Sequence, residues 1–302
     1  MKTIIFGAGS DLGVHIDGAN LGPAQLINDI KNIYKDEIIS FNQDESIIKS
    51  RNLSDRRKNE YDIEKFNTDL YNSIVEKTNN EMFPITIGGD KSITVPSALA
   101  SASKYGQDNI GLIFISSHAD YNTFETTITG NIAGLSMAAI NGYKNHELRY
   151  FHKGNVIQTA KSAIVGARSI EDCEKDNIRY SGINIYSTND LKEKGIEEVM
   201  EEAFKIAENK TKGVHICFCL DIIDPEVAPG VSIPKFDGLT EDEAMQLNKS
   251  ILKHIDNIIS YDIVDLNPLR DQDRKTEQIA LNLLVQVINA ANNKGKSFTR
   301  KY

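Results

Sequence analysis

Residues 110–117, IGLIFISS, form a short and continuous apolar run that ends in two serines. Similar runs, rich in β-branched residues, recur along the chain: TIIFG (3–7), EIISF (37–41), FPITIGG (83–89), SAIVGAR (162–168), INIYS (183–187), VHICFCLD (214–221) and IISYDIVDL (258–266). Strands that are apolar at nearly every position are typical of a parallel sheet covered on both faces. The chain is therefore predicted to contain about eight mostly parallel strands.

Helix-length segments lie between most of these runs. Residues 199–210 have helical spacing, and residues 276–293 form a long amphipathic stretch. Thr240 and Glu243 match a capping box ahead of another helical segment. Strands that alternate with helices predict a three-layer α/β/α fold. No repeat, low-complexity tract or linker divides the sequence, so we expect a single domain over residues 1–302.

The composition excludes several classes of function. The 302 residues carry a formal net charge of -9 without a basic patch or arm, so nucleic acid is not an expected partner. No apolar run approaches the roughly 20 residues of a membrane span, so no membrane partner is expected. The three cysteines, Cys173, Cys217 and Cys219, are sparse and odd in number. This usage suits a reducing compartment, and we expect a cytoplasmic protein.

Chemically active residues follow several of the predicted strands. Lys91 follows the glycine pair at the end of one strand, and Cys219 and Asp221 end another. Ser116, His118 and Asp120 stand two positions apart after IGLIFI and share one face of an extended segment. In open α/β sheets, ligands bind outside the carboxyl ends of the strands. These residues are therefore the candidate site.

Five ordered motifs resemble those of the arginase (ureohydrolase) family over nearly the whole chain. They are GGDKS (88–92), SHADYNT (117–123), TGNIAGL (129–135), VGARSIEDCE (165–174) and HICFCLDIIDPEVAPG (215–230). The resemblance implies an arginase-like α/β/α fold and a homo-oligomer, a trimer or a hexamer. It also implies two Mn²⁺ ions, bridged by a hydroxide that attacks a guanidinium carbon.

Three of the six metal-ligand positions that the resemblance implies carry other residues. The family patterns GGDHS, DAHxD and SFDxDxxDP keep His118, Asp120 and Asp221 as metal-ligand candidates here, whereas Lys91, Ser116 and Cys219 replace the other three ligands. The family's active-site histidine falls on Ala133. The formal charge of the six positions changes from about -4 to about -1, which weakens attraction for two divalent ions. We expect no cofactor or, as the alternative, a single Zn²⁺ or Mn²⁺ ion.

Lys91 offers an explanation for these replacements. Its ammonium is expected to lie between Asp120 and Asp221 and to stand in for the cations, because a buried carboxylate pair needs a counter-charge. His118 is then a hydrogen-bonded core histidine or a ligand of a single metal. Cys219 is a small buried residue, or it completes a zinc site with His118, Asp120 and Asp221. A third possibility is a thiolate nucleophile at Cys219, activated by His118 or Lys91.

The other end of the implied pocket keeps its polar character. By resemblance, Asn122 and Thr129 grip the α-carboxylate of an amino acid, and Thr127 and Asn131 belong to the same polar loop. Glu171, with Glu174 after it, falls at the position that binds the α-amino group. Asp265 takes the place of the glutamate that faces the guanidinium. The same residues also suit a structural role in the loop, so both roles stay open.

We interpret the sequence as an arginase-like protein without arginase activity that binds arginine or a related amino acid or guanidine. The alternative is a hydrolase that cleaves a guanidine or amidine C–N bond with a single metal or with Cys219. A scaffold without a ligand is the third possibility. The remaining histidines are expected to be structural or exposed: His15, His146, His152, His215 and His254.

Overall fold

The computed structural model describes residues 1–302 except 36, 146–147, 149–151, 153, 155 and 295–302. Within that part of the chain, one parallel sheet has the strand order β2-β1-β3-β8-β7-β4-β5-β6. The strands are β1 (Lys2–Gly9), β2 (Ile38–Asn42), β3 (Met82–Gly88), β4 (Ile110–Ile115), β5 (Ser162–Ala167), β6 (Asn184–Ser187), β7 (Gly213–Cys219) and β8 (Ile258–Val264). The prediction of about eight mostly parallel strands is confirmed, and all their pairings are parallel.

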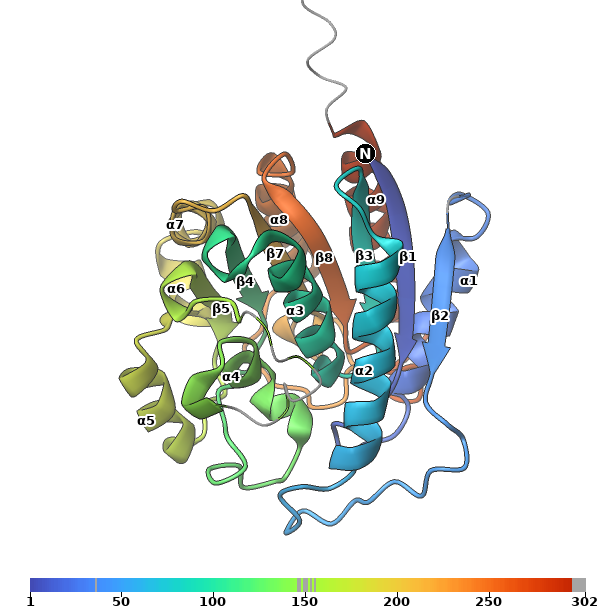
Figure 1. The fold of residues 1–302 in the computed structure, drawn as a ribbon, viewed down its shortest axis with the longest axis vertical. Coiled ribbons are helices and arrows are strands. Elements are labelled where there is room, and N and C mark those ends of the chain that lie inside the picture. The colour runs from blue at the N-terminus through green and yellow to red at the C-terminus, as the bar shows by residue number, and fades with distance from the viewer. Residues whose placement is uncertain (36, 146–147, 149–151, 153, 155, 295–302) are drawn as a thin grey trace, which may run out of the picture.

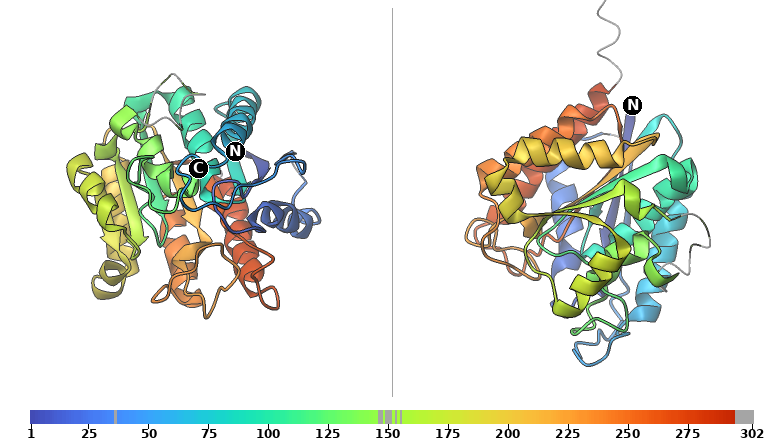
Figure 2. Two further views of the ribbon diagram at one scale, coloured as in Figure 1. Left: turned by 90° about the horizontal axis from the view of Figure 1, so that it is seen from below. Right: turned by 90° about the vertical axis from the view of Figure 1, so that its left-hand side faces the viewer.

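Helices cover both faces of the sheet, as the three layers in Figures 1 and 2 show. The α-helices are α1 (Gly22–Ile30), α2 (Glu60–Lys77), α3 (Thr94–Tyr105), α4 (Ser136–Ile140), α5 (Asp172–Ser181), α6 (Thr188–Glu193), α7 (Ile196–Ala207), α8 (Glu241–Lys253) and α9 (Lys275–Asn293). Core residues of α1, α7, α8 and α9 pack in one cluster, and those of α2, α3 and α4 in another. The predicted capping box of Thr240 and Glu243 begins α8.

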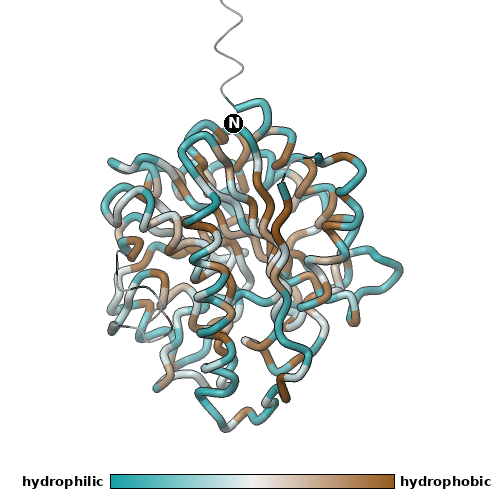
Figure 3. The backbone as a smooth tube through the Cα atoms, turned by 45° about the vertical axis from the view of Figure 1, so that its right-hand side comes forward, coloured by the Kyte–Doolittle hydropathy of each residue, from teal (hydrophilic) through white to brown (hydrophobic). Residues whose placement is uncertain are grey.

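Alternate residues of each central strand enter opposite layers. On β4, Ile113 belongs to the cluster under α7–α9, and Phe114 belongs to the cluster under α2–α4. On β7, Phe218 and Cys219 divide in the same way. Both layers need apolar side chains, so the strands are apolar at successive positions, and Figure 3 shows this hydrophobic centre inside a hydrophilic exterior.

Candidate functional site

Four adjacent strands carry the candidate residues. In the order β3-β8-β7-β4, Lys91 follows β3, Asp265 follows β8, Cys219 ends β7 and Ser116 follows β4. Parallel strands present their carboxyl ends at the same edge, at the lower side of Figure 1. Residues that are far apart in the sequence therefore meet there.

The turn after β3 places Lys91. A Cβ atom on Gly89 would lie 1.9 Å from the carbonyl oxygen of Ser10, so only glycine allows this approach to the end of β1. Asp90 then accepts hydrogen bonds from the backbone N–H of Gly13 (2.7 Å) and of Ser92 (2.7 Å). The second bond caps the 3₁₀ turn Lys91–Ile93, which turns the lysine toward β4 and β7.

The Lys91 ammonium lies between two carboxylates, as the sequence predicts. Its Nζ is 2.8 Å from Asp120 Oδ2 and 3.1 Å from Asp221 Oδ2. It also donates to Ser116 Oγ at 3.2 Å and lies 3.4 Å from His118 Nδ1. The contact with Asp120 is an ion pair without hydrogen-bond alignment, because among the described residues Asp120 Oδ2 has no hydrogen-bond partner. The lysine side chain is only 8% exposed, so the cluster is closed to bulk water.

Asp221 is the most strongly hydrogen-bonded carboxylate of the cluster. It accepts from Ser117 N (2.9 Å) and Ser116 Oγ (3.0 Å), and its Oδ2 is 2.8 Å from His118 Nδ1. Ser116 thus donates to the carboxylate. His118 is a hydrogen-bonded histidine at the edge of the core, which agrees with the first of the two roles predicted for it.

The charges in the cluster support one another. Burial opposes a charged Lys91, but Asp120 and Asp221 outweigh it and raise the pKa of the ammonium well above its usual range. Burial also opposes a charged Asp221, yet Lys91 and His118 hold the pKa of that carboxyl well below its usual range. For Asp120, burial prevails and its pKa is raised. The Lys91–Asp221 pair therefore stays ionised across the physiological range.

Two of these aspartates have a left-handed backbone. Asp120 has φ 50° and Asp265 has φ 72°. Residues other than glycine adopt this region at a cost of about 1–3 kcal/mol, and such strained residues are enriched at functional sites. The backbone oxygen of Asp120 accepts from Met137 N (3.0 Å) and Ala138 N (3.3 Å) at the start of α4. Those bonds hold the carboxylate over the sheet edge.

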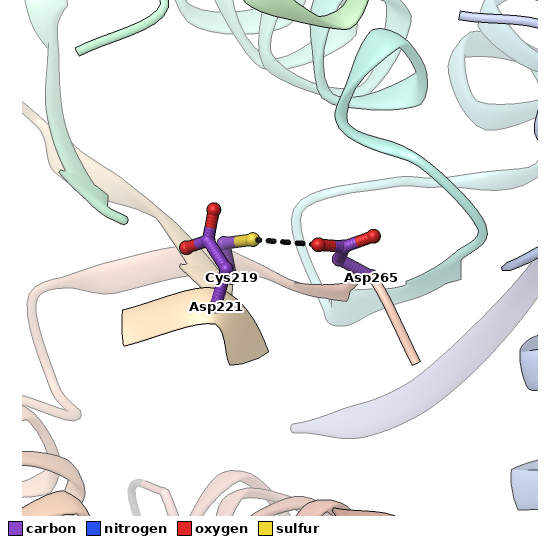
Figure 4. A group of neighbouring side chains, drawn as sticks. All are labelled: Cys219, Asp221 and Asp265. Carbon is purple, nitrogen blue, oxygen red and sulfur yellow. Dashed lines mark hydrogen bonds between the residues drawn. The ribbon is translucent and has the colours of Figure 1, made fainter. Parts of the chain in front are cut away.

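Cys219 lies beside Asp265 (Figure 4), with 3.9 Å between its Sγ and Asp265 Oδ2. Burial raises the pKa of the Cys219 thiol well above its usual range. The thiol therefore stays protonated, which argues against a thiolate nucleophile. Cys219 is fully buried and is absent from the described residues that line the pocket below.

The zinc site of Cys219, His118, Asp120 and Asp221 stays a prediction. Among the described residues, Cys219, Asp221 and Asp265 form a group whose three donor atoms all lie within 4.8 Å of one another. His118 and Asp120 are not part of this group: His118 Nδ1 contacts Asp221 Oδ2 at 2.8 Å, and the Lys91 ammonium lies between Asp120 and Asp221. Burial and the charge of Asp221 raise the pKa of Asp265 to about 7.

A pocket of about 210 Å³ opens above this floor. Lys91, His118, Asp120 and Asp221 form its base, with Ala133 at the position of the family's active-site histidine. All the predicted ligand-binding residues line it: Asn122, Thr127, Thr129, Asn131, Glu171, Glu174 and Asp265. Segments after β4, β5 and β8 thus bring the whole predicted set together.

The polar wall of the pocket is ordered by its own side chains. Asn122 Nδ2 donates to Glu171 Oε2 (3.1 Å), and Thr127 Oγ1 accepts from Gly130 N (3.0 Å). Thr129 Oγ1 accepts from Asn131 N at 3.3 Å. These residues therefore structure the loop, which is one of the two roles left open by the sequence. They also line the pocket, and their role in ligand binding stays a prediction.

Glu171 and Glu174 form a capping box at the start of α5. Glu174 accepts hydrogen bonds from the backbone N–H of Tyr121 (2.6 Å) and of Glu171 (3.2 Å). Burial raises the pKa of Glu174 to about 7 in spite of these bonds. Neither glutamate has an ion pair within the described part of the chain. Within the described residues, the two wall glutamates therefore have no cationic partner, and Glu174 is partly protonated near pH 7.

Sequence reasoning missed two titratable residues of the pocket. His15 lines it, with its Nδ1 3.1 Å from Asn131 Oδ1, although we expected that histidine to be structural or exposed. Lys235 also lines the pocket. Their positions in the sequence could have identified them, because His15 follows β1 and Lys235 follows the turn beyond β7. Of the other histidines, His152, His215 and His254 lie outside the pocket lining, and His146 lies outside the described residues.

Comparison with known proteins agrees with this geometry. The model of the arginase family matches residues 1–289. The chain belongs to the arginase family. Similar relatives are the arginases of Bacillus caldovelox, 32% identical over 94% of this chain and 97% of that protein, and of Bacillus subtilis, 31% identical over 95% and 98%. The solved B. caldovelox arginase superposes with a TM-score of 0.84 at 28% identity, covering 95% of this chain and 98% of that one. The predicted family and fold are confirmed.

Proposed function

We propose that this arginase-family chain binds arginine or a related small cationic amino acid and does not hydrolyse it with a dinuclear manganese centre. The observation that carries the proposal is the Lys91 ammonium, 2.8 Å from Asp120 and 3.1 Å from Asp221. An internal cation fills the place where the family chemistry needs external ones.

The donor atoms do not fit two divalent ions. Of the six positions, Lys91 is a cation, Ser116 offers a neutral hydroxyl and Cys219 a thiol whose pKa is raised by burial. At an effective dielectric of 20, two like charges 4 Å apart repel by roughly 4 kcal/mol. A divalent ion at a similar distance from the charged Lys91 ammonium would be repelled more strongly than a unit charge. We therefore propose a metal-independent protein without a resident cofactor.

The pocket itself supports a small cationic ligand. Its volume of about 210 Å³ is below the roughly 300 Å³ at which pockets for drug-sized ligands begin, and it suits a ligand of amino-acid size. Glu171 and Glu174 on the wall have no ion pair in the described chain, so an ammonium group would supply their missing counter-charge. Asn122 and Thr129 stand close by with polar groups for a carboxylate.

Calorimetric titration with L-arginine, beside a urea assay after loading with Mn²⁺ or Zn²⁺, tests the proposal. We expect saturable binding of one arginine per chain and no urea above the buffer level. Glu171→Gln should weaken binding roughly tenfold or more, because a charge-assisted hydrogen bond becomes a neutral one. Glu198→Gln, an exposed change on α7, is the matched control. Urea release with Mn²⁺ would overturn the proposal, and so would the absence of both binding and urea, which fits a scaffold.

A second candidate is a hydrolase with a single metal ion, and the group of Cys219, Asp221 and Asp265 favours it. Metal content per chain, measured by mass spectrometry after the same loading, separates the two candidates. We expect values near zero for both metals. One Zn²⁺ per chain that Cys219→Ala removes would establish the second candidate. Two Mn²⁺ per chain would contradict our interpretation of Lys91.

We also propose that the chain forms a homo-oligomer, a trimer or a hexamer, in the cytoplasm. The oligomer rests on the family resemblance, and the compartment rests on the three free cysteines. Within the described residues, no helix is both long and apolar enough to span a membrane. Light scattering coupled to size-exclusion chromatography measures the number of chains directly.

A further inference from the structure

A second hollow of about 940 Å³ adjoins the pocket and has the opposite charge. It lies between the segment after β5, the start of α6 and residues 235–237, and we call it the side groove. Ser169 and Lys235 line both the side groove and the pocket. The two hollows are therefore neighbours with a common border.

Cations dominate the side groove. Arg168, Lys175, Lys192 and Lys235 line it, against a single acidic residue, Asp237. This excess of positive charge stands out in a chain whose formal net charge is -9.

Most of these cations have no carboxylate partner. Lys175 pairs with Asp172 at 2.8 Å on the open surface. Lys192 donates only to the backbone oxygen of Asp237 (3.2 Å), and the described residues give Lys235 no ion pair. Lys192 and Lys235 thus concentrate positive charge there without an ion-pair partner among the described residues, a condition that draws anions into a concave site.

Arg168 makes the groove rigid. It donates to the backbone oxygens of Phe236 (2.9 Å), Ile222 (3.2 Å), Asp221 (3.0 Å) and Lys235 (2.7 Å). A guanidinium has five N–H groups, so four are used on neutral carbonyls and its charge has no ion pair in the described chain. These bonds fix residues 235–236 against the end of β7, so the border residue Lys235 is held in place.

We propose that the side groove binds the oxyanion group, a phosphate or a carboxylate, of a small molecule. Lys192 and Lys235 supply the charge for this group, Arg168 holds the frame, and the hydroxyl of Ser169 lies at the border with the pocket. The site is distinct from the pocket, whose wall carries carboxylates, and it does not depend on arginine binding there.

Titration of the full-length protein with inorganic phosphate and, separately, with citrate tests the proposal at a fixed ionic strength near 0.15 M. At that ionic strength, contacts between exposed charges beyond about 8 Å are largely screened. We expect saturable binding of one anion per chain. If phosphate binds more tightly than citrate, the natural ligand carries a phosphate group. If citrate binds more tightly, the natural ligand carries a carboxylate group.

Variants place the binding in the groove. Lys192→Ala should weaken anion binding roughly tenfold, and Lys192→Ala with Lys235→Ala should remove it. Lys65→Ala, an exposed lysine on α2, is the matched control and should change nothing. Glu171→Gln should leave anion binding intact and Lys192→Ala should leave arginine binding intact, so the two sites fail or succeed separately. Binding that does not saturate, or that survives the double substitution, would overturn the proposal.

Discussion

The floor and the wall of the pocket neutralise their carboxylates in different ways. On the floor, Asp120 and Asp221 have the Lys91 ammonium within 3.1 Å. On the wall, Glu171 and Glu174 rely on an amide and on backbone N–H groups. The floor therefore contains its own counter-charge, whereas the described residues give the two wall glutamates no ion pair. This difference is the reason that we propose ligand recognition at the wall and a supporting role for the floor.

The largest expected effect comes from removing the floor's cation. Lys91→Met leaves Asp120 and Asp221 buried together without a counter-charge, and breaking a buried pair in this way costs about 3–5 kcal/mol. We expect a loss of this size in the free energy of unfolding, measured with urea at pH 7. The exposed substitution Lys65→Met should stay within about 0.5 kcal/mol.

A companion variant keeps this test informative if Lys91→Met does not fold. Adding Asp120→Asn removes one of the unpaired charges and should recover part of the lost stability, because replacing both partners of a buried pair is much less costly than removing one. A loss below about 1 kcal/mol for Lys91→Met would show that the ammonium is not the counter-ion of the floor.

The wall gives the next largest effect, as a pH dependence. Burial raises the pKa of Glu174 to about 7, above its usual value of 4.5. The folded protein therefore holds more protons than the unfolded chain between these values, and stability falls as the pH rises through that window. One pKa unit corresponds to 1.36 kcal/mol, so the contribution of Glu174 is on the order of 3 kcal/mol.

Glu174→Gln keeps an acceptor for the cap and mimics the protonated acid. We expect its free energy of unfolding to decline less than that of the wild type between pH 4.5 and 8, and the variant to be the more stable protein at pH 8. Urea unfolding at a series of pH values measures this. Part of the decline should persist, because burial raises the pKa of Asp265 in the same direction. If the free energy of unfolding declined equally in both proteins, a group other than Glu174 would be responsible for the pH dependence.

Periodicity and strand-end position predicted the fold and the residues of the floor, whereas the residues of the wall were predicted from the resemblance to the arginase family. Runs that are apolar at successive positions required a sheet covered by helices on both faces. Because the strands are parallel, the residues after β3, β4, β7 and β8 had to lie at the same edge of the sheet. The place of Lys91 between Asp120 and Asp221 also followed, since buried carboxylates need a cation.

The details that sequence reasoning missed depend on distances that sequence spacing does not set. Cys219 and Asp265 come from adjacent strands, and only the register of β7 against β8 brings them together. His15 reaches the pocket because the loop after β1 folds back on Asn131. The left-handed backbone of Asp120 and Asp265 gave no signal in the sequence either, because aspartate is common in many other conformations.

The smallest effect should come from Cys219, and it sharpens the division between floor and wall. The thiol is buried, its pKa is raised, and it lies outside the pocket lining. Cys219→Ala should therefore cost about 1 kcal/mol, a typical loss for a small buried change. Arginine affinity, measured by calorimetry, should change by less than about twofold, since we propose that the wall recognises the ligand. A variant that folds normally but loses arginine binding would make the thiol part of the binding site, and the floor would then do more than replace the charge of the missing metal ions.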